Sequence, residues 1–261
     1  MNETLNCLEQ LQKNIDANSE LKVDIFVVDD GSTDGTKEQI NYKYPEVTII
    51  QTAGSLFWSK SMYIGMTRAL ELQKYEFLLM VNDDVDFYDD MIENMFKSYY
   101  MANCECGIVG TTQDNGKATY GGRTQTEVLL TPNGAIQECF FANWNCFLLP
   151  VSVVDKLGYI DNHYQHAYGD YDYSYRMMKA NIPIYVATNY VGRCANNAKR
   201  NTYADANVRK IKRLKLLFSP KGIPFYSYMR YNIKVSGVEK IWYYLYGYLS
   251  FVVYILLGRD I

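Results

Sequence analysis

Two apolar runs of this chain each end abruptly in acidic residues, and this feature constrains the fold more than any other. Residues 23–28 are mostly Val, Ile and Phe and lead into Asp29 and Asp30, while residues 77–81 lead into a second acidic turn at 82–86. Nearly continuous apolar runs predict strands that are buried on both faces. In open α/β sheets, ligands bind beyond the carboxyl ends of such strands. Two neighbouring strands of this kind would build one acidic pocket.

The segments around these strands alternate between helix-like and strand-like patterns. Apolar residues recur at helical spacing in residues 5–15, 58–74 and 91–99, whereas short apolar runs at 47–51 and 106–111 predict further strands. This alternation predicts an α/β fold, with a mixed and mostly parallel sheet flanked by helices.

The pattern changes in the second half of the chain. Residues 113–131 are rich in Gly, Thr and polar residues and predict an irregular hairpin region, and residues 139–149 read as a strand interrupted by polar groups. Gly169 then precedes a predicted helix that runs to Lys179, with Asp170 in the N-cap position. The helix dipole and the free amides at this end favour the charged form of a carboxylate.

Three motifs in a fixed order carry a resemblance to a known family. They are Val-Val-Asp-Asp-Gly-Ser-Thr-Asp-Gly-Thr at 27–36, Leu-Met-Val-Asn-Asp-Asp-Val at 79–85 and Tyr-Gly-Asp-Tyr-Asp-Tyr-Ser-Tyr-Arg at 168–176. Over roughly residues 4–195 the chain resembles the family 2 glycosyltransferases of the GT-A fold, particularly the rhamnosyltransferase-like members. That family opens with a strand whose loop lines the nucleotide-base pocket, and no such strand is found before Thr4.

The resemblance implies a donor site at the two acidic strand ends. By this likeness Asp30 binds the nucleoside base with Asp29 beside it, and Ser55 belongs to a loop that closes over the diphosphate or sugar. Asp83 lies on the ribose or metal side, and Asp84 is the ligand of a Mg²⁺ or Mn²⁺ ion. An oxygen-ligated ion of this kind neutralises the charge of a nucleoside diphosphate leaving group.

The resemblance also implies an acceptor side. Asp170 aligns with the general base of the family, although Gly169 replaces the Glu that precedes it. Asp172 is the alternative candidate for the base and is otherwise expected to bind the acceptor. Trp144 falls where the family forms its acceptor wall, while Asn82 replaces the first carboxylate of the Asp-x-Asp motif. A structural interpretation stays open for each residue: Asn82 in a turn after a strand, Asp170 as a helix cap and Trp144 as a core residue.

The implied activity is an inverting transfer of a sugar from a dTDP- or UDP-sugar, with rhamnose as the leading candidate. The acceptor would be a glycan or a lipid-linked acceptor in bacterial cell-surface polysaccharide synthesis. The opposing interpretation is a non-catalytic relative of the same fold that binds a nucleotide or a partner.

Composition and spacing argue against several other classes. A formal net charge of −3 over 261 residues gives no global case for nucleic-acid binding. The six cysteines contain no Cys-x-x-Cys pair, so reduced buried thiols are favoured over a zinc site. Gly31 stands where a haloacid-dehalogenase-type phosphatase needs its second Asp, and Gly31 and Gly35 are one residue too close for a P-loop.

The end of the chain predicts a separate helical segment. We expect a glycosyltransferase-like domain at 1–205 and a C-terminal helical segment at 206–261. Residues 241–257 carry no charge, are rich in Tyr and follow a basic stretch. A helix lying on a membrane surface is favoured, with an ordinary packed helix and a true span as alternatives. The polar start predicts no signal peptide, hence a cytoplasmic protein that can lie at the inner membrane face.

Overall fold

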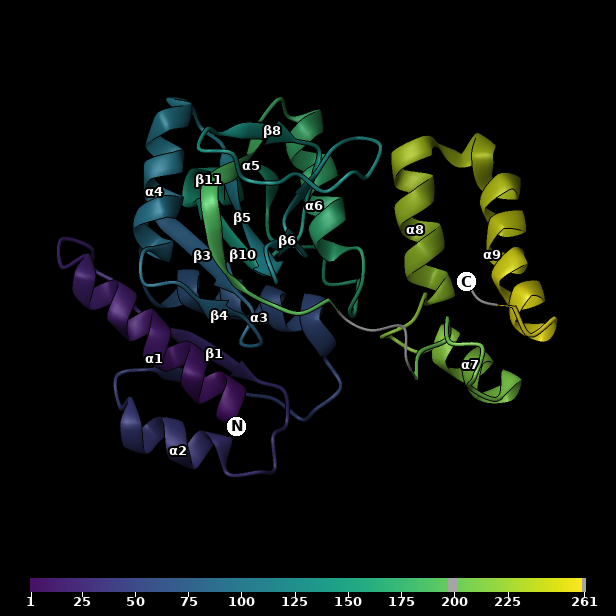
Figure 1. Cartoon of the computed structure of the whole chain (residues 1–261), viewed down its shortest axis with the longest axis horizontal. Coiled ribbons are helices and arrows are strands. Elements are labelled where there is room, and N and C mark those ends of the chain that lie inside the picture. Colours follow the sequence, from purple (N-terminus) through teal and green to yellow (C-terminus); the bar gives the residue numbers. More distant parts are fainter. Residues whose placement is uncertain (197–200, 260–261) are drawn as a thin grey trace.

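A computed structural model describes residues 1–196 and 201–259 of the protein. An α/β body holds most of the described chain, and three helices, α7 (Lys210–Leu217), α8 (Phe225–Ser236) and α9 (Ile241–Leu256), lie to one side of it (Figure 1). The mixed α/β fold that the sequence predicts is confirmed. The proposed division at residue 205 stays a prediction.

The central sheet is mixed. Its main strands run in the order β3-β10-β5-β11-β4, with β6 paired to β5 and β8 paired to β11. Their bounds are β3 Phe77–Val81, β4 Asp86–Phe87, β5 Gly107–Asp114, β6 Lys117–Ala118, β8 Gln137–Cys139, β10 Cys146–Pro150 and β11 Ile184–Arg193. β5 and β11 are parallel, whereas β10 runs antiparallel to both β3 and β5. The sheet is therefore less parallel than the alternation of elements predicted.

Helices cover both faces of this sheet. The bounds are α3 Phe57–Leu72, α4 Met91–Ala102, α5 Val151–Leu157 and α6 Gly169–Lys179. Helices α3, α5 and α6 pack on one face with Phe147 and Leu149, and α1 and α4 pack on the other with Cys146 and Leu148. Alternate residues of β10 thus face opposite cores, which explains why its sequence is apolar without interruption.

A second, two-stranded sheet lies beside the first. In it β1 (Phe26–Asp29) pairs in parallel with β2 (Thr48–Gln51), and α2 (Thr36–Lys43) connects them. Helix α1 (Asn2–Ala17), which the periodicity predicted, packs against both sheets: Leu8 contacts the β1–β2 side and Leu11 the β3–β4 side. The short strands β7 (Gly122–Arg123) and β9 (Phe141–Ala142) form a third sheet.

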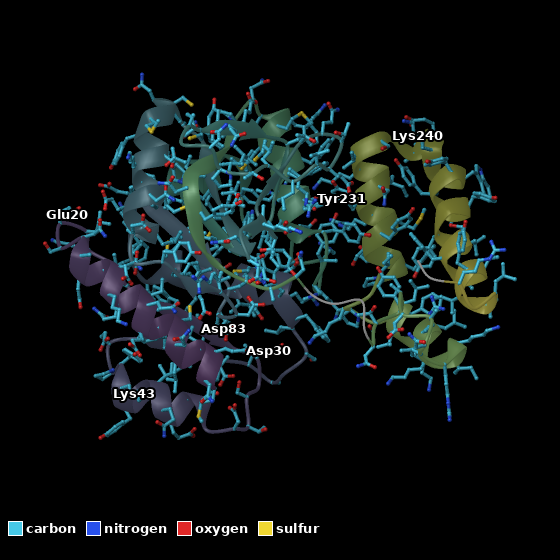
Figure 2. All side chains as sticks on the ribbon, in the orientation of Figure 1. Glu20, Asp30, Lys43, Asp83, Tyr231 and Lys240 are labelled. Carbon is cyan, nitrogen blue, oxygen red and sulfur yellow. The ribbon has the colours of Figure 1, made fainter. Side chains whose placement is uncertain are left out.

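Three helices complete the described chain. They are α7 Lys210–Leu217, α8 Phe225–Ser236 and α9 Ile241–Leu256, with a short 3-10 turn, η1, at Val238–Lys240. Helix α8 lies between the α/β body and α9, and Lys240 marks the turn from α8 to α9 (Figures 1 and 2). Among the described residues, no helix has the length and apolar character that crossing a membrane requires.

Candidate functional site

The first acidic strand end is occupied by contacts within the protein. At the end of β1, Asp30 Oδ1 accepts a hydrogen bond from Thr52 Oγ1 at 2.8 Å. Its Oδ2 accepts the amides of Ser55, Leu56 and Phe57 at 3.2, 2.9 and 3.0 Å. Partial burial opposes ionisation, but these hydrogen bonds prevail and lower the pKa of Asp30. Asp30 is thus a charged anchor for the start of α3, and both of its oxygens are engaged.

The loop that Asp30 holds is backbone-strained. Gly54 has φ 77°, and two residues that carry side chains, Ser55 and Phe57, have φ 119° and 60°. Residues other than glycine rarely adopt these angles unless their surroundings impose them, and such residues cluster at ligand-binding sites. Ser55 is exposed, so the predicted loop over the diphosphate is accessible.

Asp29 differs from its neighbour. Its side chain is buried, Oδ1 accepts the amide of Ser32 at 2.8 Å, and Oδ2 has no hydrogen-bond partner among the described residues. A buried carboxylate oxygen without a donor is costly. Asp29 therefore carries a buried acceptor oxygen that no donor among the described residues satisfies.

The second acidic strand end faces the start of α1. Thr4 Oγ1 donates to Asp83 Oδ2 at 2.6 Å, and Asn82 Oδ1 accepts the indole N–H of Trp58 at 2.7 Å. Asp83 and Asp84 are exposed. Desolvation of its carboxyl group, and next the charge of Asp83, raise the pKa of Asp84. Figure 2 shows Asp30 and Asp83 on the same side of the body, where α1 begins.

Asp170 lies in the first turn of α6. Tyr171 donates its amide to Asp170 Oδ1 at 2.9 Å, and Asn143 Nδ2 donates to Oδ2 at 3.3 Å. The N-cap is Tyr168, not Asp170 as the sequence predicted, and Tyr168 has a left-handed φ of 76°. Burial of the carboxyl group outweighs the hydrogen bonds and raises the pKa of Asp170 to about 6. The sequence led us to expect the opposite shift.

A three-residue segment connects Asp170 to the acidic strand end. Asn143 contacts Asp170, and two residues later Asn145 accepts the amide of Asn82 through its carbonyl at 3.1 Å. Consecutive Cα atoms are about 3.8 Å apart, so two peptide units separate the contacts at the two ends. The structure therefore brings Asp170 to the same side of the molecule as Asp83, as a donor and an acceptor site would require.

The glycine before Asp170 is enforced by packing. A Cβ atom at Gly169 would lie 2.5 Å from Ser59 Oγ and 2.9 Å from Ile160 Cδ1. Ser59 in turn donates to the carbonyl of His166 at 2.7 Å, so it is held in place. The departure from the Glu of the resembled family thus has a physical reason: this position has no room for a side chain.

Trp144 does not lie where an acceptor could stack on it. Its side chain is only 1% exposed, and the ring packs against Phe147 at 4.9 Å and Tyr173 at 5.0 Å between centroids. The acceptor role predicted for Trp144 is not supported by this placement. The core interpretation, which the sequence left open, describes it better.

Asp172 is a structural anion. It is fully buried, and its two oxygens contact Arg176 Nε at 3.0 Å and Lys234 Nζ at 2.6 Å. Tyr164 also donates to it at 3.3 Å. A carboxylate paired in this way is not available to an acceptor, so the acceptor role and the alternative base role of Asp172 are not supported either.

Residues of α8 line the other side of α6, and sequence reasoning missed them. The ring of Tyr231 stacks on Tyr168 at 5.2 Å, and Arg230 Nη2 lies 2.8 Å from Asp161 Oδ2. The charge of Asp170, after burial and the neighbouring Tyr171, contributes to a raised pKa of the Tyr231 hydroxyl. Tyr231 projects from α8 toward the body in Figure 2. No motif marks α8, so only its contacts identify it.

The described residues contain no group of three His, Cys, Asp or Glu side chains that could hold a metal ion. The exposed carboxylates of Asp83 and Asp84 nevertheless fit one mode of binding. Mg²⁺ is commonly held by one or two carboxylates together with substrate phosphates and water. The residues therefore suit an ion that arrives with a diphosphate, not a site built from protein ligands alone.

Comparison with known proteins agrees with this arrangement. A family model for glycosyl transferase family 2 matches residues 2–158. The chain belongs to this family. Membership places it among the glycosyltransferases, as predicted. The match includes the strand ends at Asp30 and Asp83 and stops before α6. The family match therefore does not include Asp170, and only the geometry around this residue bears on its role. No curated protein sequence matches the chain.

Two solved structures are similar to the chain at low identity. S. aureus TarS aligns with a TM-score of 0.51 and 12% identity over 95% of this chain and 47% of that chain. GalNAc-T7 with UDP, GalNAc and Mn²⁺ aligns with a TM-score of 0.49 and 13% identity over 67% of this chain and 37% of that chain. The family 2 chain thus spans less than half the length of either protein. The TarS match confirms the GT-A-like fold.

Proposed function

We propose that this family 2 chain is an inverting glycosyltransferase whose general base is Asp170. The observation that carries the proposal is the environment of Asp170 next to the acidic strand ends. Burial brings its pKa to about 6, so the carboxylate is charged at neutral pH yet remains a usable proton acceptor. The amide of Tyr171 and the side chain of Asn143 hold its two oxygens in place.

The proposed reaction is a single displacement. Asp170 takes the proton of an acceptor hydroxyl as that oxygen forms a bond to the anomeric carbon. The bond from this carbon to the diphosphate oxygen breaks, and the nucleoside diphosphate leaves with the electron pair. Inversion follows because the nucleophile and leaving group occupy opposite faces. Asn143 orients Asp170 and stabilises its charged form before the transfer.

On the donor side we propose that Asp29, Asp83 and Ser55 contact the nucleotide sugar. Asp29 has an unpartnered oxygen, but this oxygen is buried, so accepting a base or ribose donor requires the neighbouring loop to shift. Asp30 acts mainly through the loop that it anchors, because its own oxygens are engaged. Asp84, assisted by Asp83, would hold Mg²⁺ or Mn²⁺ together with the diphosphate. When bound, the ion would neutralise the charge that develops on the leaving group.

The substrate classes are proposals of the same kind. The donor is a dTDP- or UDP-sugar, with rhamnose as the leading candidate for the sugar. The acceptor is a glycan or lipid-linked acceptor of bacterial cell-surface polysaccharide synthesis, at the cytoplasmic side of the membrane.

A second candidate is a non-catalytic nucleotide-binding relative. It is favoured by the engaged oxygens of Asp30 and by the lack of a three-ligand metal group among the described residues. Both features leave room for binding without turnover. Donor hydrolysis distinguishes the two candidates, since glycosyltransferases slowly transfer their sugar to water when no acceptor is present.

The deciding experiment is a panel of dTDP- and UDP-sugars assayed for release of the nucleoside diphosphate with Mn²⁺. We expect release with at least one donor, and Asp170→Asn should lower turnover by about 10²–10⁴ while donor affinity stays unchanged. Asp172→Asn is the matched control, because it should reduce stability but not turnover of the folded fraction. Nucleotide binding without release from any donor would favour the non-catalytic relative.

A further inference from the structure

Helix α9 exposes a continuous apolar surface. Every exposed side chain from Ile241 to Leu257 is aromatic or aliphatic. We define the α9 stripe as five exposed residues that follow one another at spacings of four and three along the helix: Trp242, Tyr246, Leu249, Val253 and Leu256. Trp242 and Tyr246 are 78% and 76% exposed. Soluble surfaces rarely leave an apolar patch of this size uncovered unless it binds something.

Cations lie at both ends of the α9 stripe. Lys240 immediately precedes the helix, and Lys210 Nζ on α7 lies 2.6 Å from the carbonyl of Leu256 at its other end. Lys212 and Lys215 on α7 and Lys221 in the following loop are exposed. None of these five lysines forms an ion pair with a described residue.

The charge of the chain is strongly segregated. Residues 206–261 contain ten Lys and Arg but two Asp and Glu, a formal charge of +8, whereas residues 1–205 carry −11. An anionic surface would attract the three C-terminal helices and repel the rest of the molecule. The electrostatic field of an anionic surface would therefore both attract the chain and orient it with the C-terminal helices toward that surface.

We propose that the α9 stripe and the lysines around it dock on an anionic lipid surface, with α9 lying in the headgroup region. Trp and Tyr prefer this region, where their rings lie in apolar surroundings and their polar atoms reach water. The aliphatic residues of the stripe reach the acyl boundary, and the lysines meet lipid phosphates. The proposal depends on this surface and not on the sugar chemistry.

A second copy of the chain fits the α9 stripe less well. Two stripes packed face to face would bring two strongly basic segments together, and like charges at an interface are unfavourable. Anionic lipid satisfies the apolar and the charged parts of the surface at the same time. Figure 1 shows α8 between α9 and the α/β body, so α9 lies on the outer side of the molecule.

Docking of this kind would place the body at a defined height above the lipid. Helix α8 contacts α9 on one side, with Tyr228 and Tyr248 at 5.3 Å between ring centroids, and α6 on the other, with Lys234 Nζ 2.6 Å from Asp172 Oδ1. The helix that carries Asp170 is thus one helix away from the docked one. A lipid-linked acceptor would have a short path to it.

Vesicle flotation of the full chain tests the proposal. The vesicles are phosphatidylcholine alone or phosphatidylcholine with phosphatidylglycerol. Trp242→Glu/Leu249→Glu disrupts the α9 stripe, Lys212→Glu/Lys215→Glu removes flanking cations, and Tyr42→Glu is the control, since Tyr42 is an 84% exposed aromatic on α2. All changed residues are exposed, and circular dichroism confirms that each variant is folded.

We expect the wild type and Tyr42→Glu to float with the anionic vesicles. The stripe variant should lose flotation. The affinity of the lysine variant for the anionic vesicles should be lower by at least about tenfold. High salt should weaken wild-type binding only in part, because apolar contacts are not screened. Absence of wild-type flotation, or flotation of the stripe variant at the wild-type level, overturns the proposal. If the wild type does not float but forms a dimer, and the stripe variant is a monomer, the α9 stripe binds a second copy of the chain and the proposal is overturned.

Discussion

The ammonium of Lys234 on α8 lies 2.6 Å from a carboxylate oxygen of Asp172 on α6. Asp172 is fully buried and lies two residues from Asp170, so this ion pair ties the C-terminal helices to the helix that carries the proposed base. The ion pair therefore anchors α8 against α6, the helix that carries Asp170.

Replacing Lys234 by Met should destabilise the protein. Asp172 would keep Arg176 but lose one of its two cations, and a buried charge with incomplete pairing is costly. Because Lys234 is partly exposed, we expect a loss of about 1–3 kcal/mol, measured by urea unfolding. Lys240→Met, on an exposed lysine of the same segment, should have no effect. Equal stability of both variants would contradict the anchoring role.

Activity should depend on pH through Asp170. A general base must be deprotonated, and the pKa of Asp170 is raised to about 6 by burial. Therefore kcat/KM should be level above this value and fall about tenfold per pH unit below it. Asn143→Ala removes a donor that favours the charged form, so the acidic limb should move to higher pH. A profile that is flat down to pH 4 would exclude Asp170 as the base.

Adding a methyl group at Gly169 should be costly. The new Cβ would lie 2.5 Å from Ser59 Oγ, so Gly169→Ala should lower the free energy of unfolding by about 1–3 kcal/mol. The cost should shrink in the Ser59→Gly background, where the two Ser59 atoms are absent and the contact with Ile160 Cδ1 at 2.9 Å remains. A double-mutant cycle measures this coupling, and purely additive effects would show that the clash is relieved elsewhere.

Asp84→Ala should remove metal-dependent nucleotide binding and leave the fold intact. The side chain is exposed, so its loss opens no cavity. Calorimetry with UDP and dTDP, with and without Mn²⁺, should show metal enhancement in the wild type and none in the variant. The control is Asp86→Ala, an exposed carboxylate of β4 that contacts Asn6 on α1 at 2.6 Å. Unchanged metal enhancement in Asp84→Ala would reject the assignment.

The sequence by itself determined the local elements and the place of the site. The 3.6-residue period identified α1, α3 and α4, and short, nearly continuous apolar runs identified the buried strands, because these patterns record which side chains each element buries. The acidic residues after β1 and β3 marked the ligand side, since strand ends are where a sheet presents polar groups. The three motifs added the family, which the match over residues 2–158 confirmed.

Only the tertiary structure decided what individual site residues can do. Asp30 is engaged by a loop 25 to 27 residues away, and Asp172 by Lys234, which is 62 residues away. The direction of the pKa shift of Asp170 depends on burial by several elements, which outweighs the local helix end. Trp144 is core and not surface because Phe147 and Tyr173 cover its ring. Long-range packing sets burial and pairing, and neither has a local signature in the sequence.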